Sequence, residues 1–523
     1  MKQYNSNPYK IFFLFLLSIC ISVFGWAQTT PAKDTIVPAK GNPVQQLKEI
    51  KTEKKEQFTD SANGQPSKNA VIDTTKNNKY GDLLKDDTAY NKKSRFIKPF
   101  LQITGINLFQ LTVDRYLLNA DYARVGFQSW GDNLRNGMEW DTDRFGVNFI
   151  GHPYTGSMYF NTARSNGYNY FQSFGYAASG SLMWEFFGEN TKPSYNDLIV
   201  TPVSGAFLGE ILYRLSSNIL DDRTRGAERV FREMLAGIVN PIRGLNRLFQ
   251  GKTSRITNKE VYQKEPLNVT LIGGMHKINE DNKVIFGKGP VNPFISVQFD
   301  YGNPFEDRPR QPFDLFRLRT AFSFGVGRKI LDNITGYGLL FGRNKQFGKL
   351  SMLIGGFQYY DYWDNKSFEL GAIGFGGAAF FKLPLSKQSI LYTNIHLGVI
   401  PFSGNSTRFG PDTSQFRDYS YGGGLESKLE ATLVLGKNIT ANLLYHYYFI
   451  KTYIGAPGSN FIGILEPKVT FRVFKNLGIG FQEYAYADNR KLEGFDPIRS
   501  TRTEQKIFLT LFLEDAQRKG RYH

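Results

Sequence analysis

The stretch FRLRTAFSF, residues 316–324, carries the pattern that decides the fold. Phenylalanine, leucine and threonine at its even-numbered positions alternate with arginine, alanine and serine at the odd-numbered ones. A β-strand with this period of two has one apolar face and one polar or small face. The same alternation recurs in five later stretches, at residues 391–399, 428–435, 441–448, 468–473 and 507–514.

From Asn268 onward the chain consists of such stretches, separated by turn residues such as Asn333, Asn438 and the pair Asp364-Asn365. Each stretch is near the length of about ten residues that a tilted membrane strand needs. The pattern predicts an antiparallel transmembrane β-barrel of about twelve strands at residues 266–515, because an even count lets the sheet close. The expected strand starts lie near Asn268, Phe294, Phe316, Ile334, Lys349, Phe368, Ile390, Tyr419, Ile439, Phe461, Leu477 and Glu504.

A soluble β-sandwich would show the same alternation, with its apolar side facing inward. Aromatic residues clustered at 359–363 and 445–449 favour the membrane barrel, since interfacial girdles lie near strand ends. The C-terminus does not add to this argument. The segment Glu514–His523 is polar and lacks the terminal aromatic residue often seen in such barrels, so the strand signal ends at Leu513.

The composition is typical of a barrel, with 15% aromatic residues, 52 glycines and a mean hydropathy of −0.35. That hydropathy excludes a multi-helix membrane protein. The formal charge is +17, and the basic residues are scattered. We expect outer-membrane lipid or lipopolysaccharide as the partner, and no nucleic acid. A basic surface without any ligand remains the alternative.

The N-terminus predicts export to the outer membrane. Lys2 and Lys10 precede an apolar run at residues 11–24, which is too short for a membrane helix. Residues 1–27 are therefore expected to be a cleaved signal peptide. A lipoprotein signal ending at Cys20 is the alternative, but Ile19 is bulky where a small residue is needed. Cys20 is the only cysteine, so the mature chain would have neither disulfides nor thiolate sites.

Two further regions precede the barrel. Residues 28–95 are polar and predict a disordered linker that could engage a periplasmic partner. Residues 96–260 predict a small helical domain, with helices near 106–118, 170–189, 198–219 and 225–239.

Four details of this domain carry expectations. Ser194 and Asp197 resemble a capping box, and Pro202 predicts a kink in the helix that follows. Gly205 and Gly209 would let a neighbouring helix approach closely. The helix at 225–239 has one apolar stripe, which predicts packing against its own domain or, as the alternative, contact with a membrane surface.

The helical domain also contains the candidate catalytic residues His152, Glu185, Glu189, Asp197 and Glu210. Carboxylates one helical turn apart face the same way. With a histidine they could hold a divalent cation, or act as general base and acid around a bound ester. Helix caps and surface ion pairs would account for the same residues. The sequence names no metal or cofactor, and it contains no serine-hydrolase elbow, P-loop or zinc-protease motif.

This region resembles a family of Bacteroidetes-type envelope proteins known as a domain of unknown function, over about residues 130–255. The resemblance implies an exported envelope protein and assigns no role to any residue. It is carried by Asn148-Phe-Ile-Gly-His-Pro-Tyr, Ala163-Arg164, Trp184-Glu185, Asn196-Asp197, Thr201-Pro202 and Gly209-Glu210.

Three functions remain open, and whether the protein is an enzyme stays undecided. The favoured one is a narrow pore, transporter or structural barrel whose helical domain plugs the lumen or lies in the periplasm. The second is a lipid-modifying hydrolase or acyltransferase that uses the helical-domain cluster. The third is an assembly or anchoring protein. Convergence of the five candidate side chains in space would favour the enzyme.

Overall fold

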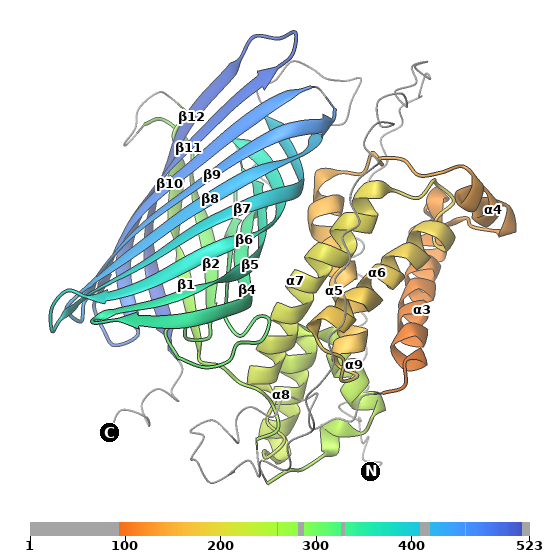
Figure 1. The fold of residues 1–523 in the computed structure, drawn as a ribbon, viewed down its shortest axis with the longest axis horizontal. Helices are drawn as coiled ribbons and strands as arrows, with labels where there is room; N and C mark the ends of the chain where they lie inside the picture. Colours follow the sequence, from red (N-terminus) through yellow and green to blue (C-terminus); the bar gives the residue numbers. More distant parts are fainter. Residues whose placement is uncertain are drawn as a thin grey trace, which may run out of the picture.

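The computed structural model describes residues 94–258, 260–280, 287–325, 330–365, 367–407, 419–455 and 457–514. The predicted signal peptide, and all but the last two residues of the predicted linker, lie outside these ranges. The described chain forms a group of helices followed by a barrel (Figure 1). The helices are α3 (Ile97–Thr112), α4 (Phe127–Arg135), α5 (His152–Arg164), α6 (Tyr170–Phe187), α7 (Tyr195–Ile219), α8 (Gly226–Val239) and α9 (Pro241–Phe249).

The strands of the barrel are β1 (Leu267–Ile278), β2 (Val291–Tyr301), β3 (Phe316–Ser323), β4 (Leu331–Phe347), β5 (Leu350–Asp364), β6 (Phe368–Pro384), β7 (Ser389–Thr407), β8 (Ser420–Leu435), β9 (Ile439–Ile454), β10 (Gly458–Arg472), β11 (Leu477–Leu492) and β12 (Ile498–Leu513). Each strand pairs antiparallel with its sequence neighbours, and β12 pairs with β1 to close the barrel. The predicted fold class is confirmed. Every expected strand start lies within six residues of the observed one, the largest difference being at β12.

The two faces of the barrel wall follow the alternation in the sequence. On β3, Arg317 and Arg319 point into the lumen, where they pair with Glu430 on β8 and Glu466 on β10. Phe316 therefore points outward with the other apolar residues of its strand. The end of the barrel where β1 begins and β12 ends is called the terminal end below.

The helices lie against the outer wall of the barrel (Figure 1). The phenolic OH of Tyr170 on α6 donates to Oε1 of Gln358 on β5 at 2.7 Å, and Nε2 of Gln358 donates to the Val203 carbonyl at 2.9 Å. A Cβ at Gly371 on β6 would lie 2.3 Å from the Phe149 ring. These contacts place the helices outside the lumen, so a plug formed by them is not confirmed. Large ion-paired side chains fill the lumen, whereas glycines and tyrosines on the wall leave room for helices.

The expected close approach of helices is confirmed where α5 meets α7. A Cβ at Gly205 would lie 2.4 Å from the backbone of Gly156, and one at Gly209 would lie 2.7 Å from the ring of Phe160. Backbones meet directly at this crossing, which only residues without a side chain allow. Helices α4, α5 and α9 were not expected from the sequence, and α5 supplies this contact.

Other helix details differ from expectation. Helix α7 begins at Tyr195 and continues as one helix through Pro202. The expected capping box is wrong, because Ser194 makes no side-chain cap and its hydroxyl instead contacts the carboxylates of Glu185 and Asp197.

The apolar face of helix α8 was expected to be buried, but its polar face is buried instead. Its apolar side chains are exposed, with Phe231 65% accessible, while Arg229 and Glu233 are buried. Arg229 pairs with Asp222 at 2.9 Å, and Arg247 on α9 pairs with Glu233 at 2.7 Å. The preferred prediction, that the apolar stripe packs against its own domain, is wrong because this ion-pair network holds the polar face inside.

The expected aromatic girdle on β5 is also wrong. Tyr360 and Tyr362 are buried against the helices, and Tyr359 and Trp363 are buried on the lumen side. Tyr445 on β9 is 40% exposed and faces outward as expected.

Candidate active site

His152 lies where the first turns of α5 and α7 meet. This is the end of the barrel at which β8 begins, away from the terminal end. Its ring Nδ1 is 3.2 Å from the hydroxyl oxygen of Thr201. Its Nε2 is 3.2 Å from Oδ1 of Asp197 and 3.9 Å from Oδ2 of Asp143. A histidine between a hydroxyl group and a carboxylate can accept a proton at one nitrogen while the other stays paired with the carboxylate.

The site is buried except on the side of Asp143. The side chains of His152 and Asp197 are 14% and 7% exposed, whereas that of Asp143 is 51% exposed. Asp143 belongs to the non-helical segment before the π-helical turn Val147–Gly151 that leads into α5. Asp143 is therefore the most exposed of the three side chains.

Glu185 supports Asp197 from behind. Its Oε2 accepts hydrogen bonds from the Ser194 backbone N–H at 2.8 Å and from the Ser194 hydroxyl at 2.9 Å. That hydroxyl also contacts the carboxylate of Asp197. Hydrogen bonds thus join Glu185, Ser194 and Asp197 and hold the carboxylate of Asp197 in place, 3.2 Å from Nε2 of His152.

The barrel completes the site. The side-chain amide of Asn148 donates to the hydroxyl oxygens of Tyr419, at 2.7 Å, and Tyr421, at 2.9 Å. The Tyr421 hydroxyl in turn donates to Asp141 at 3.1 Å. Asn196 donates to both Asp141, at 2.6 Å, and Asp197. Polar groups of the barrel and of the helices therefore share one network.

Three of the five predicted site residues come together, namely His152, Asp197 and, through Ser194, Glu185. Glu210 does not join them, because it forms buried ion pairs with Arg164 and Arg214, each at 2.8 Å.

Glu189 does not join them either. It accepts hydrogen bonds from the Trp184 indole at 2.6 Å and from the Thr191 hydroxyl at 3.0 Å. Burial, together with the charge of Glu185, raises the pKa of Glu189 to about 8. Glu189 is therefore a helix-end residue held by its neighbours.

Several members of the network were not among the residues predicted from the sequence. Asn148 and Asn196 lie in the motif that carries the family resemblance, so that motif was the available signal. Asp143 has no such signal, and Tyr419 and Tyr421 are about 270 residues away in the chain. The hypothesis that these residues hold a divalent cation gains no support. Among the described residues, no three His, Cys, Asp or Glu side chains are grouped as metal ligands.

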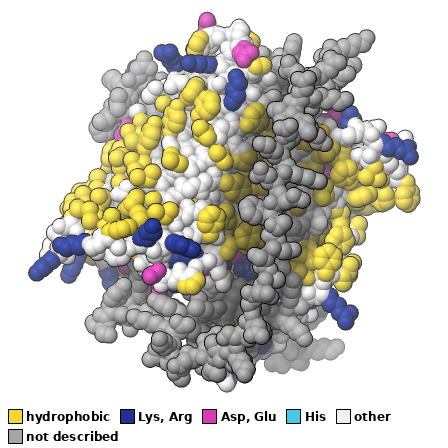
Figure 2. All heavy atoms as spheres, in the orientation of Figure 1, with side chains coloured by type: hydrophobic (Ala, Val, Ile, Leu, Met, Phe, Trp, Pro, Cys, Tyr) yellow, Lys and Arg dark blue, Asp and Glu magenta, His cyan; other side chains and the backbone are white. Residues whose placement is uncertain are grey.

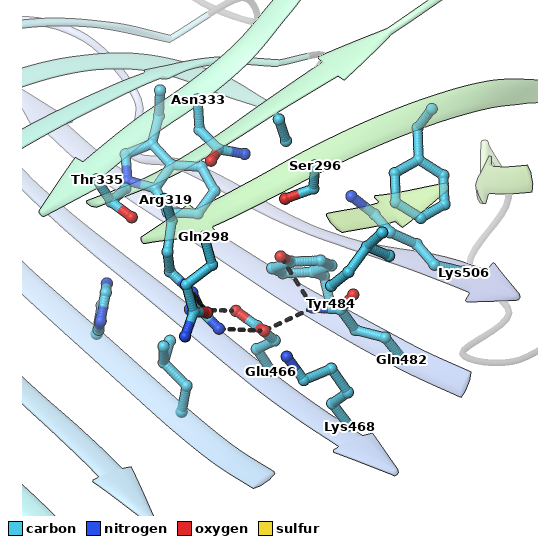
Figure 3. A pocket seen from close by; sticks show the side chains of 16 residues that line it. Ser296, Gln298, Arg319, Asn333, Thr335, Glu466, Lys468, Gln482, Tyr484 and Lys506 are labelled. Atoms are coloured by element: carbon cyan, nitrogen blue, oxygen red, sulfur yellow. Dashed lines mark hydrogen bonds and ion pairs between the residues drawn. The ribbon is translucent and has the colours of Figure 1, made fainter. Parts of the chain in front are cut away.

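The lumen contains a second group of charged residues, shown in Figure 3. Arg319 is 3.3 Å from Glu466, and Gln482 donates to Glu466 at 2.5 Å. Lys428 on β8 reaches Asp361 on β5 at 2.5 Å. A cavity lined in part by Arg319, Glu466 and Gln482 has a volume of about 30 Å³, which is room for one or two water molecules.

Comparisons with known proteins add a family match. Residues 137–242 match a family described as Domain of unknown function (DUF3943). A search of curated proteins gives no match.

Among solved structures, the chain is similar over about half its length to outer-membrane barrels. For the NanC porin the identity is 7%, covering 47% of this chain and 98% of that one, with a TM-score of 0.27. For the outer-membrane phospholipase A from Escherichia coli the identity is 10%, covering 47% of this chain and 92% of that one, with a TM-score of 0.24. For an outer-membrane channel from Pseudomonas putida F1 the identity is 9%, covering 48% of this chain and 96% of that one, with a TM-score of 0.26. Such scores transfer no function.

The family match covers α5, α6, α7 and α8 and includes His152, Glu185 and Asp197. The chain therefore carries a DUF3943 domain at residues 137–242, followed by a closed antiparallel barrel of twelve strands in its described part.

Proposed function

We propose that the protein is an integral outer-membrane enzyme that cleaves or transfers an acyl ester of an envelope lipid at His152. The barrel serves as its membrane scaffold. The observation that carries this proposal is the position of the His152 ring between the Thr201 hydroxyl and the carboxylates of Asp197 and Asp143.

The membrane location is supported by the outer wall of the barrel. Leu397, Ile507 and Leu509 point outward and are 66%, 60% and 58% exposed. A closed barrel leaves no unpaired strand edge, and its lumen is polar. A barrel with an apolar outer wall and a polar lumen has the arrangement of an outer-membrane barrel.

The filled lumen favours a scaffold over an open pore. We expect the wild-type protein in planar lipid bilayers to show no steady ion conductance. The double variant Arg317→Ala/Arg319→Ala should conduct, because it removes two cross-lumen links and leaves Glu430 and Glu466 as unpaired negative charges. Single-channel recording measures the conductance of the wild-type protein and of the double variant.

The matched control for conductance is Arg472→Ala. Arg472 pairs with Glu514 at the rim of the barrel at 2.9 Å, so its loss should leave the lumen closed. A steady conductance of the wild-type protein would instead support the pore.

The proposed reaction is acyl transfer. His152 Nδ1 takes the hydroxyl proton of Thr201 as that oxygen attacks the ester carbonyl carbon. The imidazolium is stabilised by Asp197 at Nε2 and returns the proton to the leaving alcohol. Water, or a second alcohol, then releases the acyl group from Thr201. The substrate class is an acyl ester of phospholipid or lipopolysaccharide.

The test is fatty-acid release from vesicles of phosphatidylethanolamine and lipopolysaccharide, measured by mass spectrometry with the purified full-length protein. We expect His152→Asn to lower the rate about 10²–10⁴-fold, the usual contribution of a general base. Thr201→Val should abolish release, whereas Thr201→Ser should retain it, because serine keeps the hydroxyl group.

The control variant is Glu228→Gln on the exposed face of α8, which should keep the wild-type rate. Release that depends on His152 but survives Thr201→Val would make water the nucleophile. No release by the wild-type protein from either lipid would contradict the proposal.

A further inference from the structure

The helical domain has its apolar side chains outside and its charged side chains inside. On α3, Leu101 and Leu108 are 61% and 58% exposed, and on α6, Phe171 and Leu182 are 65% and 47% exposed. Leu101 and Leu108 are seven residues apart, so they lie on one stripe of the helix. A water-soluble helix presents such a stripe to its own core.

The charged residues of α3, α5, α6 and α7 have the reverse distribution. These four helices are fully described and, besides His152, contain six charged residues. Lys98 lies in the first turn of α3 and is partly exposed. The other five are at most 5% exposed, namely Arg164, Glu185, Asp197, Glu210 and Arg214. Paired charges turned toward the interior are characteristic of helices surrounded by lipid.

Two of the helices, α6 and α7, approach or exceed the thickness of the hydrocarbon layer. Helix α7 has 25 residues and α6 has 18, which at 1.5 Å per residue correspond to about 37 Å and about 27 Å. The hydrocarbon core is about 30 Å thick, and thinner in the outer membrane. Among the described helices, α7 alone meets the length and composition of a membrane span by itself.

Helix α7 extends along the outer wall from one end of the barrel to the other. Near its start, Asn196 is joined through Asn148 to Tyr421 at the end opposite the terminal end. Near its finish, Arg214 donates to the Pro312 carbonyl at 2.9 Å, beside the start of β3 at the terminal end. Helices α5 and α6 pack against α7, and α3 packs against α5 and α6 (Figure 1). The helices therefore stand at the same level as the barrel strands.

Apolar side chains are exposed both on the barrel wall and on the helices. Figure 2 shows apolar side chains gathered on the barrel wall at the left and on the helical domain at the right, with Lys and Arg near the ends of both. A band of this kind, bordered by basic residues, matches a bilayer with its two headgroup layers.

We propose that the helical domain is embedded in the lipid bilayer beside the barrel, with α3 and α6 in contact with acyl chains. The occupant of this apolar face is lipid. The proposal needs the barrel to lie in the membrane, but it is independent of any chemistry at His152. It would place the His152 network at the wall of the barrel at bilayer level, within reach of a lipid.

The test labels single cysteines in the full-length mature chain, which would contain no other cysteine. Leu108→Cys and Leu182→Cys are each labelled with a small fluorophore in vesicles that contain nitroxide-labelled phosphatidylcholine. Leu397→Cys on β7 is the lipid-facing reference. Lys437→Cys, in the exposed turn between β8 and β9, is the water-facing reference. We expect both helix labels to lose fluorescence to the lipid nitroxide as strongly as Leu397→Cys.

The aqueous quencher iodide supplies the opposite readout. Quenching of the helix labels by iodide as at Lys437→Cys would overturn the proposal and place the domain in water. Protection from both quenchers, with a dimer in sedimentation analysis, would also overturn it and make a second copy the occupant. Lipid quenching without fatty-acid release would leave this inference standing and refute only the proposed enzyme.

Discussion

Glu210→Gln is expected to lower the stability of the helical domain by about 3–5 kcal/mol, as the loss of one partner from a buried ion pair does. Glu210 is fully buried between Arg164 and Arg214. Glutamine keeps the size of the side chain but leaves two buried guanidinium groups without their shared carboxylate. Arg214 also pairs with Asp314 of the barrel at 3.2 Å, so its disturbance should loosen the docking of the helices.

The measurement for Glu210→Gln is the urea midpoint of tryptophan fluorescence in detergent. Glu228→Gln is the matched control, since Glu228 pairs with Arg232 one turn later but is 58% exposed. Its effect should be only about 0.3–0.5 kcal/mol. Equal midpoints for the two variants would show that the buried ion pair contributes no more than a surface one.

Gly156→Ala is expected to destabilise the same domain by about 1–3 kcal/mol or more, the usual range for overpacking. A Cβ at this position would lie 1.8 Å from the carbonyl oxygen of Thr201 and 3.0 Å from Cα of Gly205. These are backbone atoms that cannot rotate away, so α5 and α7 must separate. His152 and Thr201 lie on these two helices, so fatty-acid release should fall as well.

Gly175→Ala on α6 is the control for Gly156→Ala. A Cβ at Gly175 meets no atom within 4 Å, and the position is exposed. Alanine there should stabilise the helix by about 0.5–1 kcal/mol, because glycine has the greater conformational freedom to lose. The two variants should thus move the urea midpoint in opposite directions. A shift in the same direction would contradict direct backbone contact between α5 and α7.

The helical site was predictable only in part. Glu185, Asp197 and His152 were chosen for their residue types and do form one chain of contacts. Glu210 was chosen on the same grounds, but it belongs to an arginine pair. A sequence pattern cannot separate these cases, because a buried carboxylate serves an ion pair or a proton relay according to which side chains meet it. Asp143 carried no signal because it lies in a segment without periodicity.

The sequence by itself determined the barrel, including its strands and which face of each strand is polar. In a strand, neighbouring residues point to opposite faces, so composition assigns the faces without knowledge of the partners. Only the tertiary structure decided where the helices lie and which of their faces is inside. The apolar stripe of α8 distinguishes two faces, but the surroundings of the helix select the buried one. Contacts such as Asn148 with Tyr421 exist because barrel closure and helix docking bring distant segments together.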